Sequence, residues 1–333
     1  MDIVIFEAEP WEEETFASLQ EAHRVEFTEA PLTERNVESY ADADAISTFI
    51  YSNLDREILS QFENLELVAT RSTGYDHIAL DYCREHGVTI CNVPTYGSNT
   101  VAEHVFALLL ALSHKIIDAV DRTRRGDFSL KNLRGFDLRQ KTLGVIGTGE
   151  IGRCVIEIAA GFHMDVLAYD VNPDEEAAGE LGFEYTSLDD LLSRSDVVSL
   201  HVPLNDETRH LLSYDEFDQM KDGAILINTA RGDIVHTKAL LRALSDGSVA
   251  AAGLDVLPEE PTIREEAELL RSIFREEHDL ENLLADHVLL RMRNVIITPH
   301  SAFNTREAVE RILETTVDNI AAYAAGEPRN AVL

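Results

Sequence analysis

The sequence predicts an α/β protein built from two doubly wound parallel sheets in two domains. One basis is length, because 333 residues exceed the roughly 100 to 150 of a typical single domain. A second is the alternation of short apolar segments with helix patterns, which is typical of parallel strands joined by helices. The third is a glycine-rich turn, Gly147-x-Gly149-x-x-Gly152, which follows an apolar segment and opens a helix.

The first series of elements lies in the N-terminal third of the chain. We expect strands at 3–7, 25–28, 45–49, 67–70 and 89–92. Helices are expected from about residue 11, at about 56–61 and at 77–86. A long helix then runs from about 100 to 126, and its apolar face continues through Val101, Val105, Leu108, Leu109 and Leu112.

The second series starts at Thr142 and contains the glycine-rich turn. We expect six parallel strands in it, the first from Leu143 into the glycine-rich turn and the others at 165–169, 197–201, 224–228, 251–254 and 295–298. An acidic amphipathic stretch at 263–290 interrupts the last unit and is interpreted as a surface insertion. A final helix at 305–326 is expected to pack on the first domain. The domains are therefore predicted as 1–99 plus 303–333 and 100–302.

The glycine-rich turn predicts a dinucleotide site of the Rossmann type. Backbone N–H groups and the positive end of the helix would face a pyrophosphate, and the glycines allow close approach. The next predicted strand ends in Asp170, 18 residues after Gly152. A carboxylate there can accept hydrogen bonds from both ribose hydroxyls of NAD and repels the 2′-phosphate of NADP, so NAD is favoured.

The charge of the chain is extreme. Acidic residues outnumber basic ones by 61 to 28, the net charge is −33, and only five residues are lysines. Such a surface repels nucleic-acid phosphates and anionic lipids, so neither nucleic acid nor membrane is an expected partner. Because molar salt screens self-repulsion within a few ångströms, we expect adaptation to high salt.

Cysteine usage and the N-terminus predict a reduced cytoplasmic protein. Cys83, Cys91 and Cys154 are odd in number and lack metal-binding spacing, so no metal is expected. The N-terminus has neither a basic region nor a small-residue cleavage site. No apolar run reaches the roughly 18 residues that a membrane helix needs.

Arg231, Glu260 and His300 stand at or beyond strand ends in the second series. In an open parallel sheet, side chains at these ends converge on the ligand crevice. Oxidation of a hydroxy acid needs a base for the hydroxyl proton, a cation for the carboxylate and an open face for hydride transfer. His300 can be the base and Arg231 the cation, while Glu260 can favour the protonated imidazole and fix its tautomer.

The chain resembles the D-isomer-specific 2-hydroxyacid dehydrogenases over nearly its whole length. Four segments carry the resemblance: Thr-Ala-Arg-Gly at 229–232, Gly-Leu-Asp-Val at 253–256, Glu-Glu-Pro at 259–261 and Thr-Pro-His at 298–300. It implies that Arg231 binds the substrate carboxylate and carbonyl, and that Glu260 pairs with His300, the acid/base. It also implies that Asp255 holds the carboxamide side of the nicotinamide.

The resemblance extends to the first domain. Arg-Ser-Thr-Gly-Tyr-Asp at 71–76 is similar to the family loop whose backbone N–H groups grip the substrate carboxylate, which implies roles for Ser72, Thr73 and Gly74. Segments 93–96 and 299–303 look most like the D-lactate dehydrogenase branch. There a tyrosine and a phenylalanine shape a pocket for small acids, and these would be Tyr96 and Phe303.

The resemblance also implies a cofactor site and an assembly. The residues expected to bind NAD are Gly147, Gly149, Glu150, Ile151, Gly152, Asp170, Val202, Pro203, Thr229, Ala230 and Asp255. The helix from Val101 onward is expected to form a homodimer interface.

The leading hypothesis is an NAD-dependent enzyme that interconverts small 2-oxo and D-2-hydroxy acids, with pyruvate and D-lactate as the first substrate pair. Phosphoglycerate, glyoxylate and hydroxypyruvate remain alternatives. Formate dehydrogenases share the architecture but carry a glutamine where this chain has Glu260. An NAD(H)-sensing corepressor-like binding protein would retain the same three residues, and only the acidic surface and the lack of flanking tails argue against it.

Overall fold

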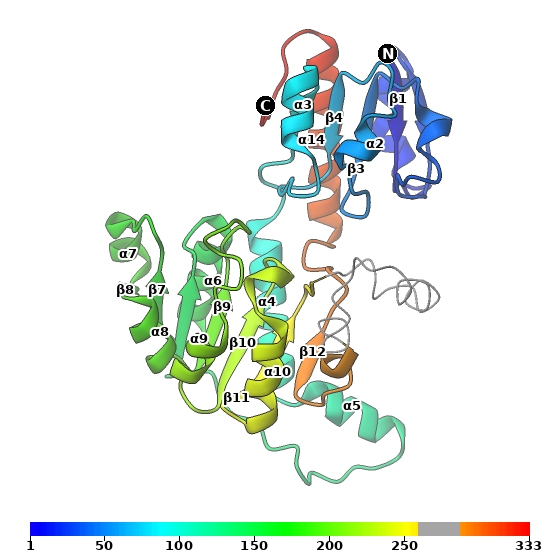
Figure 1. Cartoon of the computed structure of the whole chain (residues 1–333). Coiled ribbons are helices and arrows are strands. Elements are labelled where there is room, and N and C mark those ends of the chain that lie inside the picture. Colours follow the sequence, from blue (N-terminus) through cyan, green and yellow to red (C-terminus); the bar gives the residue numbers. More distant parts are fainter. Residues whose placement is uncertain (259–286) are drawn as a thin grey trace. The chain divides into compact units, whose positions relative to one another are not determined.

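The computed structural model describes residues 1–258 and 287–333. The chain divides into two compact units, shown in Figure 1. Unit 1 comprises Met1–Gly97 and Asn304–Leu333, and unit 2 comprises Ser98–Phe303. Unit 1 thus joins the two ends of the chain. The surface insertion predicted at 263–290 lies almost entirely outside the described residues.

Unit 1 contains a five-stranded parallel sheet in the order β2-β1-β3-β4-β5, the order of flavodoxin-like folds. Its strands are β1 (Asp2–Ile5), β2 (Arg24–Phe27), β3 (Ala45–Thr48), β4 (Leu67–Thr70) and β5 (Thr89–Cys91). Every residue of the neighbouring interior strands β3 and β4 is buried, which explains why their sequences do not alternate between buried apolar and exposed polar residues.

The helices of unit 1 are short except for the last one. They are η1 (Glu13–Phe16), α1 (Ala17–Gln20), η2 (Val37–Tyr40), α2 (Arg56–Leu59), α3 (Leu80–His86) and α14 (Arg306–Ala324). Thr305 caps α14 by accepting a hydrogen bond from the N–H of Ala308. Leu313 and Ile320 of α14 join the core around β1 and β4, so this helix packs on the first sheet as the sequence predicts.

Unit 2 contains a seven-stranded parallel sheet in the order β12-β11-β10-β9-β6-β7-β8. Its strands are β6 (Thr142–Ile146), β7 (Asp165–Tyr169), β8 (Glu184–Tyr185), β9 (Val197–Leu200), β10 (Ala224–Asn228), β11 (Val249–Leu254) and β12 (Val295–Ile297). The strand order reverses at β6, which pairs with β7 on one side and β9 on the other. The sequence predicts six strands, because β8 has only two residues and shows no periodic pattern.

Helices cover both faces of this sheet. They are α4 (Ser98–Ser113), α6 (Glu150–Gly161), α7 (Glu175–Leu181), α8 (Leu188–Arg194), α9 (Tyr214–Gln219), η3 (Gly232–Ile234) and α10 (Thr237–Asp246). One apolar cluster joins α4 and α6 to the sheet, and a second joins α8, α9 and α10 to it. The fold is therefore α/β with two Rossmann-like parallel-sheet domains.

The long helix expected over 100–126 is two helices, so that prediction is wrong. The first, α4, and the second, α5 (Ile116–Arg124), meet at a bend of 61°. Lys115 lies at the bend with φ 55°, a left-handed conformation that a continuing helix does not contain. In the part of the chain that the structure describes, no single helix is long and apolar enough to cross a membrane; only this bent pair passes such a test, and α4 is mostly buried.

Candidate active site

The carboxyl ends of the strands in unit 2 carry most of the predicted site residues. The glycine-rich turn follows β6, Asp170 follows β7, and Arg231 lies three residues after β10. Asp255 directly follows β11, and His300 lies three residues after β12. Because all seven strands are parallel, these residues lie along one edge of one sheet, where ligands of open α/β folds bind.

Two positions of the turn after β6 must be glycine, because a side chain at either one would collide with neighbouring backbone. Gly147 has φ 97°, and a Cβ there would lie 2.6 Å from the carbonyl oxygen of His201. A Cβ on Gly152 would lie 2.1 Å from the carbonyl oxygen of Gly147. At Gly149, a Cβ would meet nothing within 4 Å. The space at the N-terminus of α6 is therefore open, so a phosphate can approach the backbone N–H groups there.

Glu150, the first residue of α6, would repel a phosphate if its carboxylate faced this space. The hydroxyl of Ser98 instead donates a hydrogen bond of 3.0 Å to Oε2 of Glu150. The carboxylate is thus held beside the start of α4. A role of Glu150 and Ile151 in cofactor binding would therefore fall to their backbone N–H groups, and it stays a prediction.

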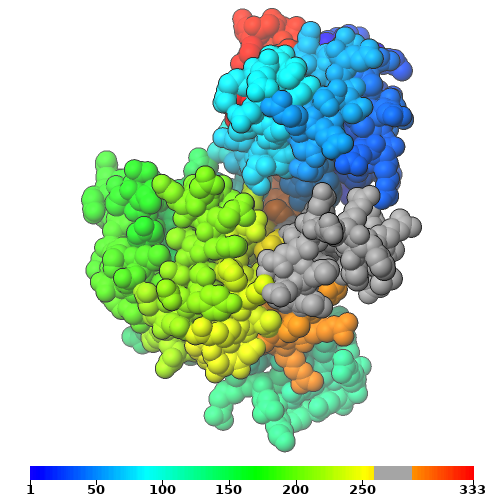
Figure 2. All heavy atoms as spheres, viewed as in Figure 1, coloured from blue at the N-terminus to red at the C-terminus, as the bar shows by residue number. Residues whose placement is uncertain are grey.

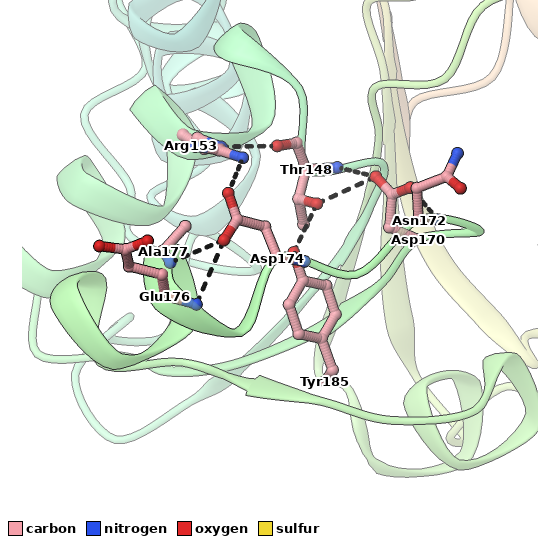
Figure 3. Close-up of polar contacts among 8 residues, drawn as sticks. All are labelled: Thr148, Arg153, Asp170, Asn172, Asp174, Glu176, Ala177 and Tyr185. Atoms are coloured by element: carbon pink, nitrogen blue, oxygen red, sulfur yellow. Dashed lines mark hydrogen bonds and ion pairs between the residues drawn. The ribbon is translucent and has the colours of Figure 1, made fainter.

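Asp170 is held at the end of β7 by its own neighbours (Figure 3). Its Oδ2 accepts hydrogen bonds from the backbone N–H of Thr148 (2.7 Å) and from the Thr148 hydroxyl (2.9 Å), and its Oδ1 accepts one from the N–H of Asn172 (2.9 Å). Partial burial alone would raise the pKa of Asp170, but these hydrogen bonds and the charge of Arg153 lower it below its ordinary value. The carboxylate is therefore ionised beside the glycine-rich turn.

A second layer of contacts supports Thr148. The hydroxyl of Tyr185 lies 2.7 Å from the Thr148 hydroxyl and accepts a hydrogen bond of 3.1 Å from the N–H of Asp174. Arg153 donates to the carbonyl oxygen of Thr148 (2.9 Å) and to the carboxylate of Asp174 (2.8 Å). Figure 3 shows these side chains converging on the turn. Sequence reasoning missed the role of Thr148, although it lies within the predicted turn, and it missed Tyr185 because only tertiary packing brings β8 to this place.

The ends of β9 and β10 add two observations that bear on a ligand. Burial lowers the pKa of His201 to about 3, so the imidazole beside the predicted residues Val202 and Pro203 is neutral. In the described part of the chain, the hydroxyl of Thr229 is buried and has no hydrogen-bond partner. A buried unpaired hydroxyl is costly, and a bound ligand would satisfy it.

The segment after β10 presents Arg231 from a braced turn. Asn228 accepts a hydrogen bond from the N–H of Ala230 (3.0 Å) and donates one to the carbonyl oxygen of Arg231 (2.9 Å). One guanidinium nitrogen of Arg231 donates to the carbonyl oxygen of Ala230 at 2.8 Å. A Cβ on Gly232 would lie 2.2 Å from the backbone of Leu257, so this turn packs tightly on the chain after β11.

The turn after β12 holds His300 in an uncommon conformation. His300 has φ 53°, in the left-handed region. Its N–H donates hydrogen bonds to the carbonyl oxygens of Asp255 (2.8 Å) and Thr298 (3.0 Å). The carboxylate of Asp255 is fully buried and accepts hydrogen bonds from this same turn. Glu260, the third member of the predicted catalytic set, lies outside the described residues.

The predicted substrate loop belongs to unit 1 and follows β4. The hydroxyl of Ser72 donates to the carbonyl oxygen of Gly74 at 2.6 Å, and that of Thr73 donates to the carbonyl oxygen of Val93 at 2.8 Å. Asn92 donates to the carbonyl oxygen of Thr73 at 2.8 Å. In the described part of the chain, the N–H groups of Thr73 and Gly74 donate to no other group, which leaves them available for an anion.

Tyr96 and Phe303 are both half-buried, Tyr96 in unit 1 and Phe303 at the last position of unit 2. Their predicted role in a substrate pocket stays a prediction.

All three cysteines are free, and burial raises the pKa of Cys83 and Cys91 to about 11, so both are thiols. Among the described residues, no three His, Cys, Asp or Glu side chains are grouped so that they could hold a metal ion.

Comparison with known proteins identifies one family. Residues 106–302 match the D-isomer specific 2-hydroxyacid dehydrogenase, NAD binding domain. The D-lactate dehydrogenase of Escherichia coli K12 is 34% identical, with 98% of each chain covered. The glyoxylate reductase of Thermococcus litoralis is 36% identical over 89% of this chain and 85% of its own length.

A solved structure gives the same result in three dimensions. The D-lactate dehydrogenase from Aquifex aeolicus, complexed with NAD and lactic acid, superimposes with a TM-score of 0.87 at 37% identity. The similarity covers 98% of this chain and 96% of that one. The likeness therefore includes both units.

Proposed function

Because the chain belongs to the D-isomer-specific 2-hydroxyacid dehydrogenase family, we propose that it reduces pyruvate to D-lactate with NADH and catalyses the reverse oxidation. The chain is an NAD-dependent oxidoreductase that acts on CH–OH groups. The observation that carries the substrate proposal is likeness over almost the full length to D-lactate dehydrogenases, one of which is bound to NAD and lactic acid.

The cofactor site of unit 2 fits NAD. The open space at Gly149 suits the pyrophosphate, the ionised Asp170 suits the ribose hydroxyls, and the unpaired hydroxyl of Thr229 needs a polar partner. When bound, NAD supplies or accepts the hydride. The residues of this chain then have to bind the acid, orient its carbonyl and move one proton.

Three side chains divide the remaining work. His300 donates a proton to the carbonyl oxygen during reduction and accepts it during oxidation. Arg231 binds the oxo acid with its planar, permanently charged guanidinium and polarises the carbonyl. By family resemblance, Glu260 pairs with His300 and favours its protonated form.

The loop of Ser72, Thr73 and Gly74 binds the substrate carboxylate through backbone N–H groups. Two of these N–H groups donate to no other group in the described part of the chain, which is what anion binding requires. Tyr96 and Phe303 shape the pocket around the small methyl group of pyruvate.

Glyoxylate is the second candidate substrate, because the similar Thermococcus litoralis protein is a glyoxylate reductase. The deciding measurement is the loss of absorbance at 340 nm with NADH and a panel of pyruvate, glyoxylate, hydroxypyruvate and a branched 2-oxo acid. We expect the highest kcat/KM with pyruvate. A higher value with glyoxylate would transfer the assignment to that substrate, and no turnover of any 2-oxo acid would refute the proposal.

A homodimer is part of the proposal, and the surface around α5 supports it. No residue of α5 is buried, and the structure exposes apolar side chains on α5 and the loop after it: Ile116 46%, Ile117 52%, Val120 39%, Phe128 79% and Leu130 85%. In Figure 1 this segment extends away from the sheet of unit 2, and Figure 2 shows the surface of the same segment at the bottom of the view. The apolar face of α4, by contrast, is already buried in its own unit.

Charge also favours a second copy as the partner of this segment. Residues 115–139 are basic in an otherwise acidic chain, with Lys115, Arg122, Arg124, Arg125, Lys131, Arg134 and Arg139 against Asp118, Asp121, Asp127 and Asp137. A strongly acidic second copy is complementary to such a surface.

The proposal also includes adaptation to high salt, which the net charge of −33 and the presence of only five lysines favour. It further includes a cytoplasmic location.

A further inference from the structure

A buried cluster of polar side chains holds the turn that carries His300. The carboxylate of Asp255 accepts hydrogen bonds from the backbone N–H groups of Ser301 (2.9 Å) and Ala302 (2.8 Å). The hydroxyl of Thr298 donates to the same carboxylate. One side chain at the end of β11 thus binds both flanks of His300.

This bracing matters because His300 has a left-handed backbone conformation, with φ 53°. Few residues other than glycine adopt this region, and such conformations persist only where the surroundings enforce them. The N–H of His300 donates to the carbonyl oxygens of Asp255 and Thr298, so the conformation depends on both residues staying in place.

His104, on α4, closes the cluster from the other side. Its Nε2 lies 3.0 Å from the hydroxyl oxygen of Thr298 and 3.4 Å from Oδ1 of Asp255. Thr298 gives its only hydroxyl proton to Asp255, and a carboxylate only accepts, so Nε2 of His104 is the donor to both. The His104 side chain is 21% exposed and that of Asp255 is 0% exposed.

The fold brings α4 close enough for this contact through a glycine on β11. A Cβ on Gly253 would lie 3.0 Å from Cβ of Leu108 and 2.9 Å from Cδ1 of Ile227, so a larger residue would push α4 away. Leu108 lies one helical turn after His104, on the same face of α4. The position of His104 is therefore set by close packing of α4 on the sheet.

The buried carboxylate needs all of its donors. Burial alone would raise the pKa of Asp255, but the hydrogen bonds from His104, Thr298, Ala302 and Ser301 lower it below its ordinary value. Asp255 is therefore an anion without solvent contact, and losing one donor leaves part of a buried charge unpaired. The structure must then rearrange around Asp255. The segment that would move is the turn after β12, which carries His300.

We propose that His104 is a positioning residue of the reaction: through Thr298 and Asp255 it holds the turn that presents the His300 imidazole to the substrate. This inference rests on the proposed function, in which His300 is the acid/base. In the described residues of unit 2, the hydrogen bonds and ion pairs of the His104 side chain are with Thr298 and with the fully buried carboxylate of Asp255, and not with the glycine-rich turn. We therefore expect His104 to act on the proton-transfer step and to leave binding of NADH and oxo acid intact.

The test compares two nearly isosteric variants, His104→Gln and His104→Met. Glutamine keeps a donor near the position of Nε2, whereas methionine fills similar space without one. Thr298→Val removes the hydroxyl that accepts the hydrogen bond from His104, and the double variant His104→Met/Thr298→Val completes a double-mutant cycle.

His114→Met is the control, since His114 is exposed just beyond the end of α4. Each protein is assayed for kcat, KM for pyruvate, NADH affinity by fluorescence and thermal midpoint.

We expect His104→Met and Thr298→Val each to lower kcat by about 10- to 100-fold, the scale of a small misplacement of a reacting group. KM and NADH affinity should stay within about twofold, while His104→Gln and His114→Met stay close to wild type. The double variant should be little worse than either single one, because both remove the same interaction.

Three outcomes would overturn the inference: kcat of His104→Met within about threefold of wild type, a loss confined to KM or NADH affinity, or fully additive losses in the double variant. If His104→Met fails to fold, His104→Gln and Thr298→Val carry the comparison. His300→Ala separates the two proposals. A large loss there with none at His104 leaves the proposed function standing and removes only the positioning role.

Discussion

Thr148 donates two hydrogen bonds to one carboxylate oxygen of Asp170, from its backbone N–H at 2.7 Å and from its hydroxyl at 2.9 Å. The middle of the glycine-rich turn and the end of the next strand are therefore one unit. The Thr148 hydroxyl is itself in contact with the Tyr185 hydroxyl. Tyr185 therefore helps to fix the position of the Asp170 carboxylate, which would meet the cofactor ribose. If Asp170 binds the ribose as proposed, a ribose hydroxyl would meet a preoriented acceptor and a 2′-phosphate would meet a fixed negative charge.

Cofactor choice follows from this arrangement. We expect NADH to be strongly preferred over NADPH, and Asp170→Ser to improve kcat/KM for NADPH by about tenfold or more, because the repulsion is removed. Asp165→Ser is the matched control, since Asp165 is exposed at the opposite end of the same strand. Steady-state rates with both cofactors measure the effect. Equal use of NADPH by the wild type would show that Asp170 does not reach the ribose.

The roles proposed for His300, Glu260 and Arg231 predict three different kinetic signatures. His300→Ala should lower kcat by about 10² to 10⁴, the usual range for loss of a general acid, with a smaller effect on substrate affinity. Glu260→Gln should move the upper pH limit of pyruvate reduction to lower pH, because the charge that favours the imidazolium is lost. Arg231→Lys should weaken pyruvate binding and lower kcat, because the planar guanidinium is lost.

One set of pH–rate profiles for wild type and these variants measures all three effects. The profiles use pyruvate, or the best 2-oxo acid of the panel if another one is turned over faster. A His300→Ala enzyme within a factor of about three of wild type would refute its assignment as the acid/base.

Stability in acid should depend on Asp255. Its pKa is lower in the folded protein than in the unfolded chain, so its contribution to the free energy of unfolding is fully present above the unfolded value, near 4. The contribution is lost as the pH falls through the folded value. Denaturation at molar KCl between about pH 6 and pH 3 should show a shallower decline for Asp255→Asn than for wild type.

Asp222→Asn serves as the control for this acid titration, because Asp222 is exposed and, in the described part of the chain, its carboxylate is in no hydrogen bond or ion pair. Its pH dependence should parallel that of wild type. Parallel curves for Asp255→Asn as well would mean that the buried carboxylate does not titrate on unfolding.

Salt should stabilise the protein. With a net charge of −33, repulsion that extends about 10 Å at 0.1 M salt is screened within a few ångströms at molar salt. The thermal midpoint and the activity should therefore rise as KCl increases towards molar concentrations. A midpoint that stays level or falls across this series would exclude adaptation to high salt.

Assembly should depend on the exposed apolar segment after α5. Phe128→Ser combined with Leu130→Ser removes the two most exposed large apolar side chains of this segment, which are 79% and 85% exposed. We expect the molar mass from sedimentation equilibrium to fall from two chains to one. Trp11→Ser, which removes an apolar side chain 55% exposed in unit 1, should leave it unchanged. A double variant that remains dimeric would place the interface elsewhere.

The sequence by itself determined the class of fold and the dinucleotide turn, because both are encoded locally. Strands β4, β7 and β10 occupy the predicted residues, since a buried parallel strand is a short apolar run bounded by polar or glycine residues. The Gly147–Gly152 spacing is equally local, because the contacts that forbid a side chain at Gly152 come from within the turn itself.

Only the tertiary structure decided which side chains support the predicted site. Tyr185 lies 37 residues from Thr148 in the chain, and His104 lies 194 residues from Thr298. The bend at Lys115 separates α4 from the exposed helix α5. The spacing of apolar residues in the sequence did not indicate this bend. The physical reason is that these contacts depend on how closely a helix packs on the sheet, as α4 does over Gly253. That packing distance is set by residues far apart in the chain, so it cannot be predicted from a short segment of sequence.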